Sequence, residues 1–111
     1  MDNNDVLRRI RYVFDLGDSD MMAMFFLADH EVTRAAVSNW LKKDDDPDFK
    51  KLSDRELAIF LNGFINDKRG KRDGEQPKPE VRLNNNLIFR KLRIALNLKD
   101  TDILELLNLA G

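Results

Sequence analysis

The stretch NNDVLRRIRYVFDLGDSDMMAMFFLAD, residues 3–29, recurs near the end of the chain as NNLIFRKLRIALNLKDTDILELLNLAG, residues 85–111. The two segments align without gaps, and most positions that differ exchange one apolar residue for another. Nine of the 27 positions are identical: Asn3/Asn85, Asn4/Asn86, Arg8/Arg90, Arg11/Arg93, Leu16/Leu98, Asp18/Asp100, Asp20/Asp102, Leu27/Leu109 and Ala28/Ala110. We interpret the recurrence as a tandem duplication of one helical unit whose second copy stops after its first half.

Length and composition favour a small folded domain. The 111 residues suffice for one compact core, and 42% hydrophobic with 35% charged residues is typical of a helical domain rather than a disordered chain. The chain has no cysteine, which excludes disulfides and thiolate metal sites. No apolar run approaches the roughly 20 residues that cross a bilayer, and the first residues, MDNND, are acidic and polar. We therefore expect a cytoplasmic protein with no membrane partner.

Two helices are predicted at the start of the chain. The first is expected over about residues 5–16, with Asn3 or Asn4 as its N-cap, because a short side-chain amide can accept from free backbone N–H groups. The second is expected to begin after an N-cap at Asp18 and to run to Ala28. Its residues are apolar almost all round, which predicts a central helix that is buried on most sides.

Two further helices complete the first unit. The third is predicted over about residues 33–43, because the acidic, proline-containing residues 44–48 that follow it end a helix. The fourth has the clearest start signal in the chain, since Ser53 and Glu56 have the spacing of a capping box. Gly70 follows two basic residues and predicts a left-handed stop at the end of this helix.

The predicted architecture is all-α, with a complete four-helix unit at residues 1–69. Residues 70–83 contain two glycines, two prolines and alternating charges, which predicts a flexible linker. Residues 84–111 repeat the first half of the unit and predict a helical pair, at about 86–97 and 101–110. Its many leucines would cost several kcal/mol if they faced water, at about 25 cal/mol per Å² of apolar area. We therefore predict that the partial repeat docks on the first unit or swaps between chains.

The same motifs resemble those of a known family. The openings NNDVLRRIRYVFDL and NNNLIFRKLRIALNLKDTDILELLNLAG, the segments LADHEV and VSNWLKKDDDPDF, and the capped LSDRELAIFLNGFINDKRGK resemble the YehS family. That family consists of small bacterial proteins built from two tandem copies of a helical domain of unknown function. The resemblance implies an all-helical fold, and it implies that family members continue through a complete second unit where this chain stops. It implies no activity, ligand or catalytic residue.

A hypothesis of nucleic-acid binding rests on two features. Helices two and three resemble a helix-turn-helix, although their turn is about two residues longer than in the compact motif. The candidate recognition helix contributes Thr33, Arg34, Ser38 and Asn39. Alternatively, equivalent positions of the two repeats could gather six cations onto one surface that meets nucleic acid or an acidic protein. These cations are Arg8, Arg9, Arg11, Arg90, Lys91 and Arg93. Packing of core helices and a solvated helix face would also explain both patterns.

The leading interpretation is a non-catalytic protein-interaction or assembly module. The partial repeat has apolar residues that need a cover, and a groove around Phe89, Leu92 and Leu96 is the first candidate for binding a protein partner or a second copy of the chain. An enzyme is not expected, because the single histidine, His30, falls in a predicted turn and no nucleophile or phosphate-loop pattern accompanies it. No metal, cofactor or small-molecule substrate is expected either.

Overall fold

The computed structural model describes residues 2–71 and 73–96 of the chain. Within these residues it has five helices and no strand: α1 (Asn3–Val13), α2 (Asp18–Leu27), α3 (Arg34–Leu41), α4 (Asp54–Arg69) and α5 (Asn85–Leu96). The all-α prediction is therefore confirmed over the described ranges. The predicted sixth helix, at residues 101–110, lies outside the described residues. No helix in the described part is both long and apolar enough to span a bilayer.

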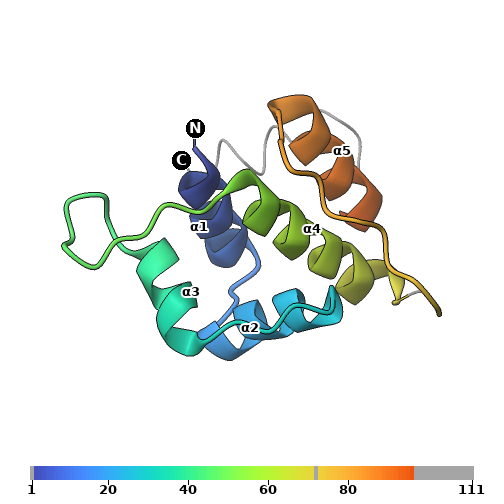
Figure 1. Ribbon diagram of the computed structural model, residues 1–111, viewed down its shortest axis with the longest axis horizontal. Coiled ribbons are helices and arrows are strands. Elements are labelled where there is room, and N and C mark those ends of the chain that lie inside the picture. The colour runs from blue at the N-terminus through green and yellow to red at the C-terminus, as the bar shows by residue number, and fades with distance from the viewer. Residues whose placement is uncertain (1, 72, 97–111) are drawn as a thin grey trace.

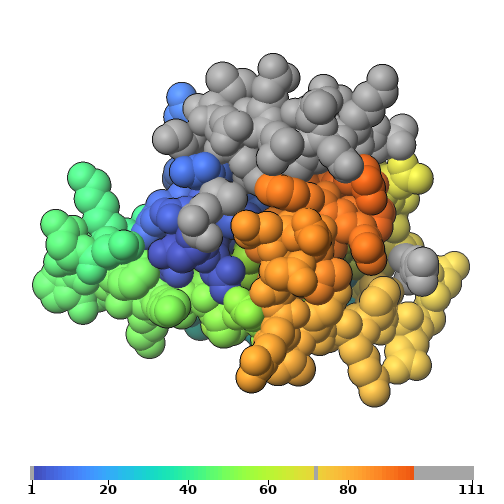
Figure 2. Space-filling view, turned by 90° about the horizontal axis from the view of Figure 1, so that it is seen from above, coloured from blue at the N-terminus to red at the C-terminus, as the bar shows by residue number. Residues whose placement is uncertain are grey.

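The long helix α4 is the platform of the fold (Figure 1). α2 and α5 make the most extensive contacts with it, while α1 packs against both α3 and α4. In the space-filling view, α1 in blue and α5 in orange occupy separate parts of the surface (Figure 2). The two helices that begin with the repeated Asn-Asn pair thus contact the same platform from different positions.

An aromatic cluster fills the space between α2, α3 and α4. The ring of Phe25 lies 5.3 Å from that of Trp40 and 5.4 Å from that of Phe60, measured between centroids. These separations are typical of stabilising aromatic pairs. Gly63 lets α2 approach α4 closely, because a Cβ atom at this position would lie 1.6 Å from the backbone oxygen of Met24. The close approach of α2 to α4 therefore depends on the absence of a side chain at position 63.

The N-cap predicted for α1 was wrong by one or two residues. Asp2 is the cap: its side chain accepts from the N–H of Asp5 at 2.8 Å, and the Asp5 carboxylate accepts from the N–H of Asp2 at 3.2 Å. Asp2 has the same kind of short acceptor side chain, and this reciprocal capping box satisfies two free donors at once. Asn3 and Asn4 consequently lie in the first turn of α1, where their side chains are free for longer-range bonds.

Two expectations for α2 also need correction. Its N-cap is Gly17, whose N–H donates to the Asp20 carboxylate at 2.9 Å, and the predicted cap, Asp18, is the first helical residue. The helix is also less buried than its composition suggests. Phe25 is fully buried, whereas the neighbouring Phe26 is 64% exposed. α4 covers one side of α2 only, so apolar composition overestimated its burial.

The ends of α3 and α4 follow from local signals. Thr33 is the N-cap of α3 and accepts from the N–H of Ala36, and the helix ends two residues earlier than predicted, at Leu41. α4 starts with the predicted reciprocal capping box of Ser53 and Glu56. It stops at Gly70, which has a φ of 90°. The capping box and the positive φ confirm both predictions for α4.

α5 docks on α4 within the same chain. Its buried side chains are Ile88, Leu92 and Ala95, which recur at helical spacing and join the hydrophobic core. α5 therefore packs on α4 within the chain, and residues 97–111 lie outside the described residues.

The segment between α4 and α5 is held to α4 by polar contacts. Asn66 donates a hydrogen bond to the side-chain oxygen of Gln76 at 3.0 Å. Nearer α5, the N–H of Leu83 donates to the Asp54 carboxylate at 3.0 Å. Through these contacts the end of the segment lies beside the start of α4, and α5 begins there.

Candidate functional site

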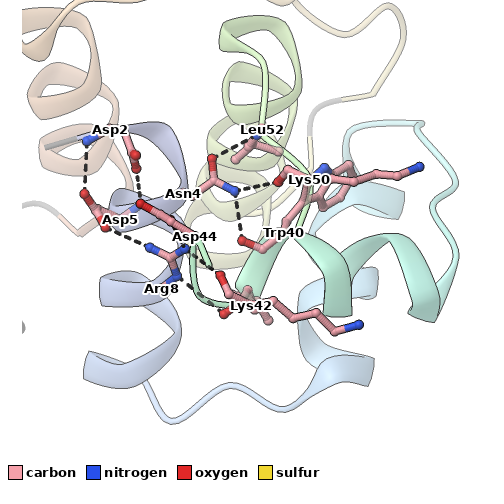
Figure 3. A network of polar contacts seen from close by, with 10 residues as sticks. Asp2, Asn4, Asp5, Arg8, Trp40, Lys42, Asp44, Lys50 and Leu52 are labelled. Carbon is pink, nitrogen blue, oxygen red and sulfur yellow. Dashed lines mark hydrogen bonds and ion pairs between the residues drawn. The ribbon is translucent and has the colours of Figure 1, made fainter. Parts of the chain in front are cut away.

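Asn4 fastens α1 to the loop between α3 and α4 (Figure 3). Its side chain is completely buried. The amide nitrogen donates to the backbone oxygens of Trp40 and Lys50, both at 2.9 Å, and the amide oxygen accepts from the N–H of Leu52 at 2.9 Å. Both N–H donors of the amide are used and its oxygen accepts one bond, so each polar atom of this buried side chain has a partner.

Asn3 adds a second connection to the start of α4. Its side-chain nitrogen donates to the backbone oxygen of Leu52 at 3.1 Å and to the Asp54 carboxylate at 2.7 Å. The hydrogen bond from Asn3, with a second from the N–H of Leu83, lowers the pKa of Asp54 below its ordinary value of 3.8. Asp54 thus links the start of α1 to the segment that leads into α5.

Arg8 closes the C-terminal end of α3. Its guanidinium donates to the backbone oxygens of Lys42 at 2.7 Å and Leu41 at 3.4 Å, which have no partner within the helix. It also forms ion pairs with Asp5 at 2.8 Å and Asp44 at 3.2 Å. The guanidinium of Arg8 is therefore paired with groups of the same chain.

The equivalent residues of α5 have a different environment. Asn85, Asn86 and Arg90 occupy the positions of Asn3, Asn4 and Arg8, and all three are exposed. Within the described residues, Asn86 and Arg90 make no hydrogen bond or ion pair. Phe89, which corresponds to the fully buried Leu7, is only half-buried. We refer to Asn86, Phe89 and Arg90 as the outer face of α5.

The six cations predicted to share one surface are not all available there. Arg8 is bound at the end of α3, and Lys91 lies in the groove between α4 and α5, where its nitrogen donates to Asn62 at 2.6 Å. Arg11, Arg90 and Arg93 are exposed, and Arg9 is half-buried. The structure thus separates Arg8 and Lys91 into two unrelated polar networks.

The residues of the candidate recognition helix take part in local contacts. Arg34 donates to the Ser19 hydroxyl at 2.9 Å and lies 3.7 Å from the Asp18 carboxylate. Asn39 accepts from Lys42 at 2.9 Å, and Ser38 is half-buried. Thr33 caps α3 as described above. The turn between α2 and α3 spans residues 28–33, longer than the three or four residues of a compact helix-turn-helix.

The predicted groove around Phe89, Leu92 and Leu96 is not open as a whole. Leu92 is 3% exposed and belongs to the core, while Phe89 and Leu96 are partly buried against it. α4 covers the apolar side chains for which the sequence alone indicated no packing partner. Of the three residues, Phe89 also borders the outer face of α5.

His30 lies in the turn after α2, where its N–H donates to the backbone oxygen of Phe25 at 3.1 Å. Its ring lies 6.3 Å from that of Phe25. The described residues contain no group of three or more histidine, aspartate or glutamate side chains that could hold a metal ion.

The role of Asn4 was not predicted from the sequence, although the sequence contains a pattern that marks this residue. Both repeats open with Asn-Asn and have an arginine four residues after the second asparagine. This spacing places Asn4 and Arg8 on one side of a helix, and the same holds for Asn86 and Arg90. The preserved pattern marks the same two side chains in α1 and α5, although only those of α1 pack against α3 and the loop that follows it.

Two comparisons with known proteins match most of the chain. A family model described as "Protein of unknown function (DUF1456)" matches residues 3–70 and 85–111. The chain is 42% identical over 107 residues to "Uncharacterized protein YehS" of Escherichia coli (strain K12), covering 95% of this chain and 68% of that relative. No solved structure matches the chain significantly.

Proposed function

The chain belongs to the DUF1456 family, and we propose that it is a non-catalytic protein-interaction module that binds its partner with the outer face of α5. One observation carries this proposal: α5 repeats the residues that fasten α1, yet exposes them. Asn4 is completely buried and both of its polar atoms are hydrogen-bonded, whereas Asn86 is exposed. A surface that presents an amide, a half-buried aromatic ring and an unpaired guanidinium is suited to protein recognition.

The contacts of α1 define the chemistry of the partner. Asn4 and Arg8 bind the backbone at the C-terminal end of a helix and in the loop that leads from it to the next helix. A partner with the same shape would offer carbonyl oxygens to Asn86 and Arg90 and apolar contact to Phe89. We expect the partner to supply a short helix followed by a loop, as residues 34–52 do here.

The proposal includes the interpretation of the chain as one complete unit and half of a second. α1 begins at Asn3 and α5 begins at Asn85, which are equivalent positions of the recurring sequence. The family model also matches in two segments that begin at or beside these positions. In this interpretation residues 1–69 contain both the anchoring helix α1 and the segment that receives it, and α5 is the equivalent of α1 in the second unit.

Site-specific photo-crosslinking in cells tests this function. A benzoylphenylalanine at position 86 is expected to form a covalent adduct with the partner. The crosslinked peptide of the partner should directly follow the C-terminal end of a helix. The same photoreactive residue at position 55, in place of the exposed Arg55 of α4, is the matched control. The affinity of the purified pair should fall at least about tenfold in Asn86→Ala. A covalent dimer would identify a second copy as the partner. Equal adducts at both positions, or an unchanged affinity, would overturn the proposal.

Nucleic-acid binding is a second candidate, supported by one feature of α1. Tyr12 is 75% exposed and borders a shallow hollow of about 410 Å³ that is also lined by Arg8, Arg9 and Arg11. An exposed aromatic ring beside cations can stack on the bases of a single strand. Fluorescence anisotropy of labelled single-stranded RNA and DNA should then show salt-sensitive binding that Tyr12→Ala weakens. No binding at about 50 μM protein and low salt would exclude this candidate.

A further inference from the structure

A pocket of about 310 Å³ lies between α4, α5 and the segment at residues 76–80. Its volume is at the lower end of the range of small-molecule sites, about 300–1,000 Å³. The apolar part of its lining comes from Ala28 after α2, Ile59 and Ile65 of α4, Pro77 and Pro79 of the segment, and Leu87 and Ile94 of α5. Stretches far apart in sequence thus form one concave, mostly apolar site.

A buried polar contact holds the segment against α5. The side chain of Lys91 is 12% exposed, and its nitrogen lies 3.0 Å from Glu80 Oε1 while it donates a hydrogen bond to Asn62. Glu80 Oε1 is buried and accepts no hydrogen bond within the described residues, so its contact with Lys91 is an ion pair alone. A charge removed from water needs such a partner. Lys91 and Glu80 therefore neutralise each other at the wall of the pocket.

Arg90 is the remaining charged residue of the pocket lining. It is exposed and makes no ion pair or hydrogen bond among the described residues. A guanidinium presents paired donors that match the geometry of a carboxylate, and it is less strongly hydrated than an ammonium group. With Lys91 neutralised by Glu80, the pocket combines apolar walls with one unpaired positive charge.

We infer that this pocket binds a small organic acid, with its apolar body between Pro77, Pro79 and Ile94 and its carboxylate paired with Arg90. The size of the pocket fits a single aromatic or branched group. The inference goes beyond the proposed interaction function, although Arg90 lies at the border of both surfaces. Asn86 is not part of the pocket lining, so Asn86→Ala separates the two: it should weaken partner binding and leave acid binding unchanged.

Two probes that differ in charge test the inference by NMR titration of the ¹⁵N-labelled full chain. Indole-3-acetate carries the carboxylate, and indole-3-ethanol has the same ring with a neutral hydroxyl group. We expect indole-3-acetate to shift backbone amides of residues 59–66, 76–80 and 87–94 and to bind at least about tenfold more tightly than the alcohol, a difference of about 1.4 kcal/mol. Amides of α3, which lies outside the pocket lining, should not shift.

Three variants make the outcome specific. Arg90→Gln should abolish the preference for the acid, whereas Arg55→Gln removes an exposed arginine outside the pocket and should preserve it. Ile94 is 48% exposed, so Ile94→Trp should fill the pocket without disturbing the core and weaken both probes. No shift with either probe, equal affinities for both, or an unchanged preference in Arg90→Gln would overturn the inference.

Discussion

α1 and α5 share an opening of two asparagines and an arginine, yet only α1 uses these side chains to hold the fold together. Asn4 is completely buried and Arg8 binds the end of α3, while Asn86 and Arg90 are exposed. Both helices bury an apolar stripe, because helical spacing of apolar residues determines this wherever a core is nearby. The comparison teaches that a polar residue becomes an anchor only when another segment supplies its hydrogen-bonding partners.

The largest expected effect is on the platform that α1 and α5 share. Gly63→Ala would place a Cβ atom 1.6 Å from the backbone oxygen of Met24, so α2 and α4 would have to separate. We expect the free energy of unfolding to fall by about 4 kcal/mol or more, measured by urea denaturation. Gly17→Ala is the control, because its nearest new contact, with Asp20, is at an ordinary 3.6 Å, and it should cost less than about 1 kcal/mol. A loss for Gly63→Ala no larger than for the control would contradict the close crossing.

A matched pair of asparagine variants addresses the comparison directly. Asn4→Ala leaves the buried backbone groups of Trp40, Lys50 and Leu52 without the bonds that Asn4 now makes, and we expect a loss of about 3 kcal/mol in the free energy of unfolding. Asn86→Ala should change this free energy by less than about 0.5 kcal/mol, because Asn86 is exposed. Both are measured by urea denaturation, and equal losses would show that α5 has an anchor comparable to that of α1.

The arginine pair sharpens the same comparison with a smaller effect. Arg8→Gln removes the donors to the backbone oxygens of Leu41 and Lys42 and should lower the free energy of unfolding by about 1.5 kcal/mol. Its ion pair with Asp44 is exposed at the carboxylate and adds little. Arg90→Gln should leave the free energy of unfolding nearly unchanged. Both variants are measured by thermal or urea denaturation. A larger loss for Arg90→Gln than for Arg8→Gln would reverse the assignment of the two arginines.

The smallest effect concerns Asp54, which contacts both regions through Asn3 and Leu83. Because hydrogen bonds lower its pKa in the folded state, its contribution to stability is present above its ordinary pKa of 3.8 and is lost as the pH falls through the folded value. Asp54→Asn should therefore lower the free energy of unfolding by less than about 1 kcal/mol at pH 7. This difference from the parent protein should close as the pH falls below 3.8 and through the lowered pKa of Asp54. A difference that stays constant as the pH falls through this range would exclude the linkage.

The sequence predicted the elements better than their long-range contacts. Apolar periodicity located all five described helices, and the capping box of Ser53 and Glu56 located the start of α4. The cap of α1 was misplaced because Asp2, Asn3 and Asn4 all carry short acceptor side chains in consecutive positions. Only the folded arrangement shows that the neighbouring amides are needed elsewhere.

The candidate site could be predicted only in part, because its partners are distant in sequence. Asn4 binds backbone groups 36–48 residues away, and backbone groups leave no signature in the residue types that carry them. The prediction that six cations could share one surface assumed that equivalent positions have equivalent surroundings. α1 and α5 contact α4 differently, so that assumption fails at Arg8 and Lys91.

The side-chain amide protons of Asn4 and Asn86 test the central difference between α1 and α5 most directly. They can be followed in ¹H–¹⁵N NMR spectra of the isolated chain, with Asn4→Ala and Asn86→Ala to assign the signals. We predict that the Asn4 amide protons exchange slowly with water, because both are hydrogen-bonded and buried, and that those of Asn86 exchange as fast as in a free amide. Slow exchange at Asn86 in the isolated chain would contradict the account, because it would show that α5 already has a segment that receives it.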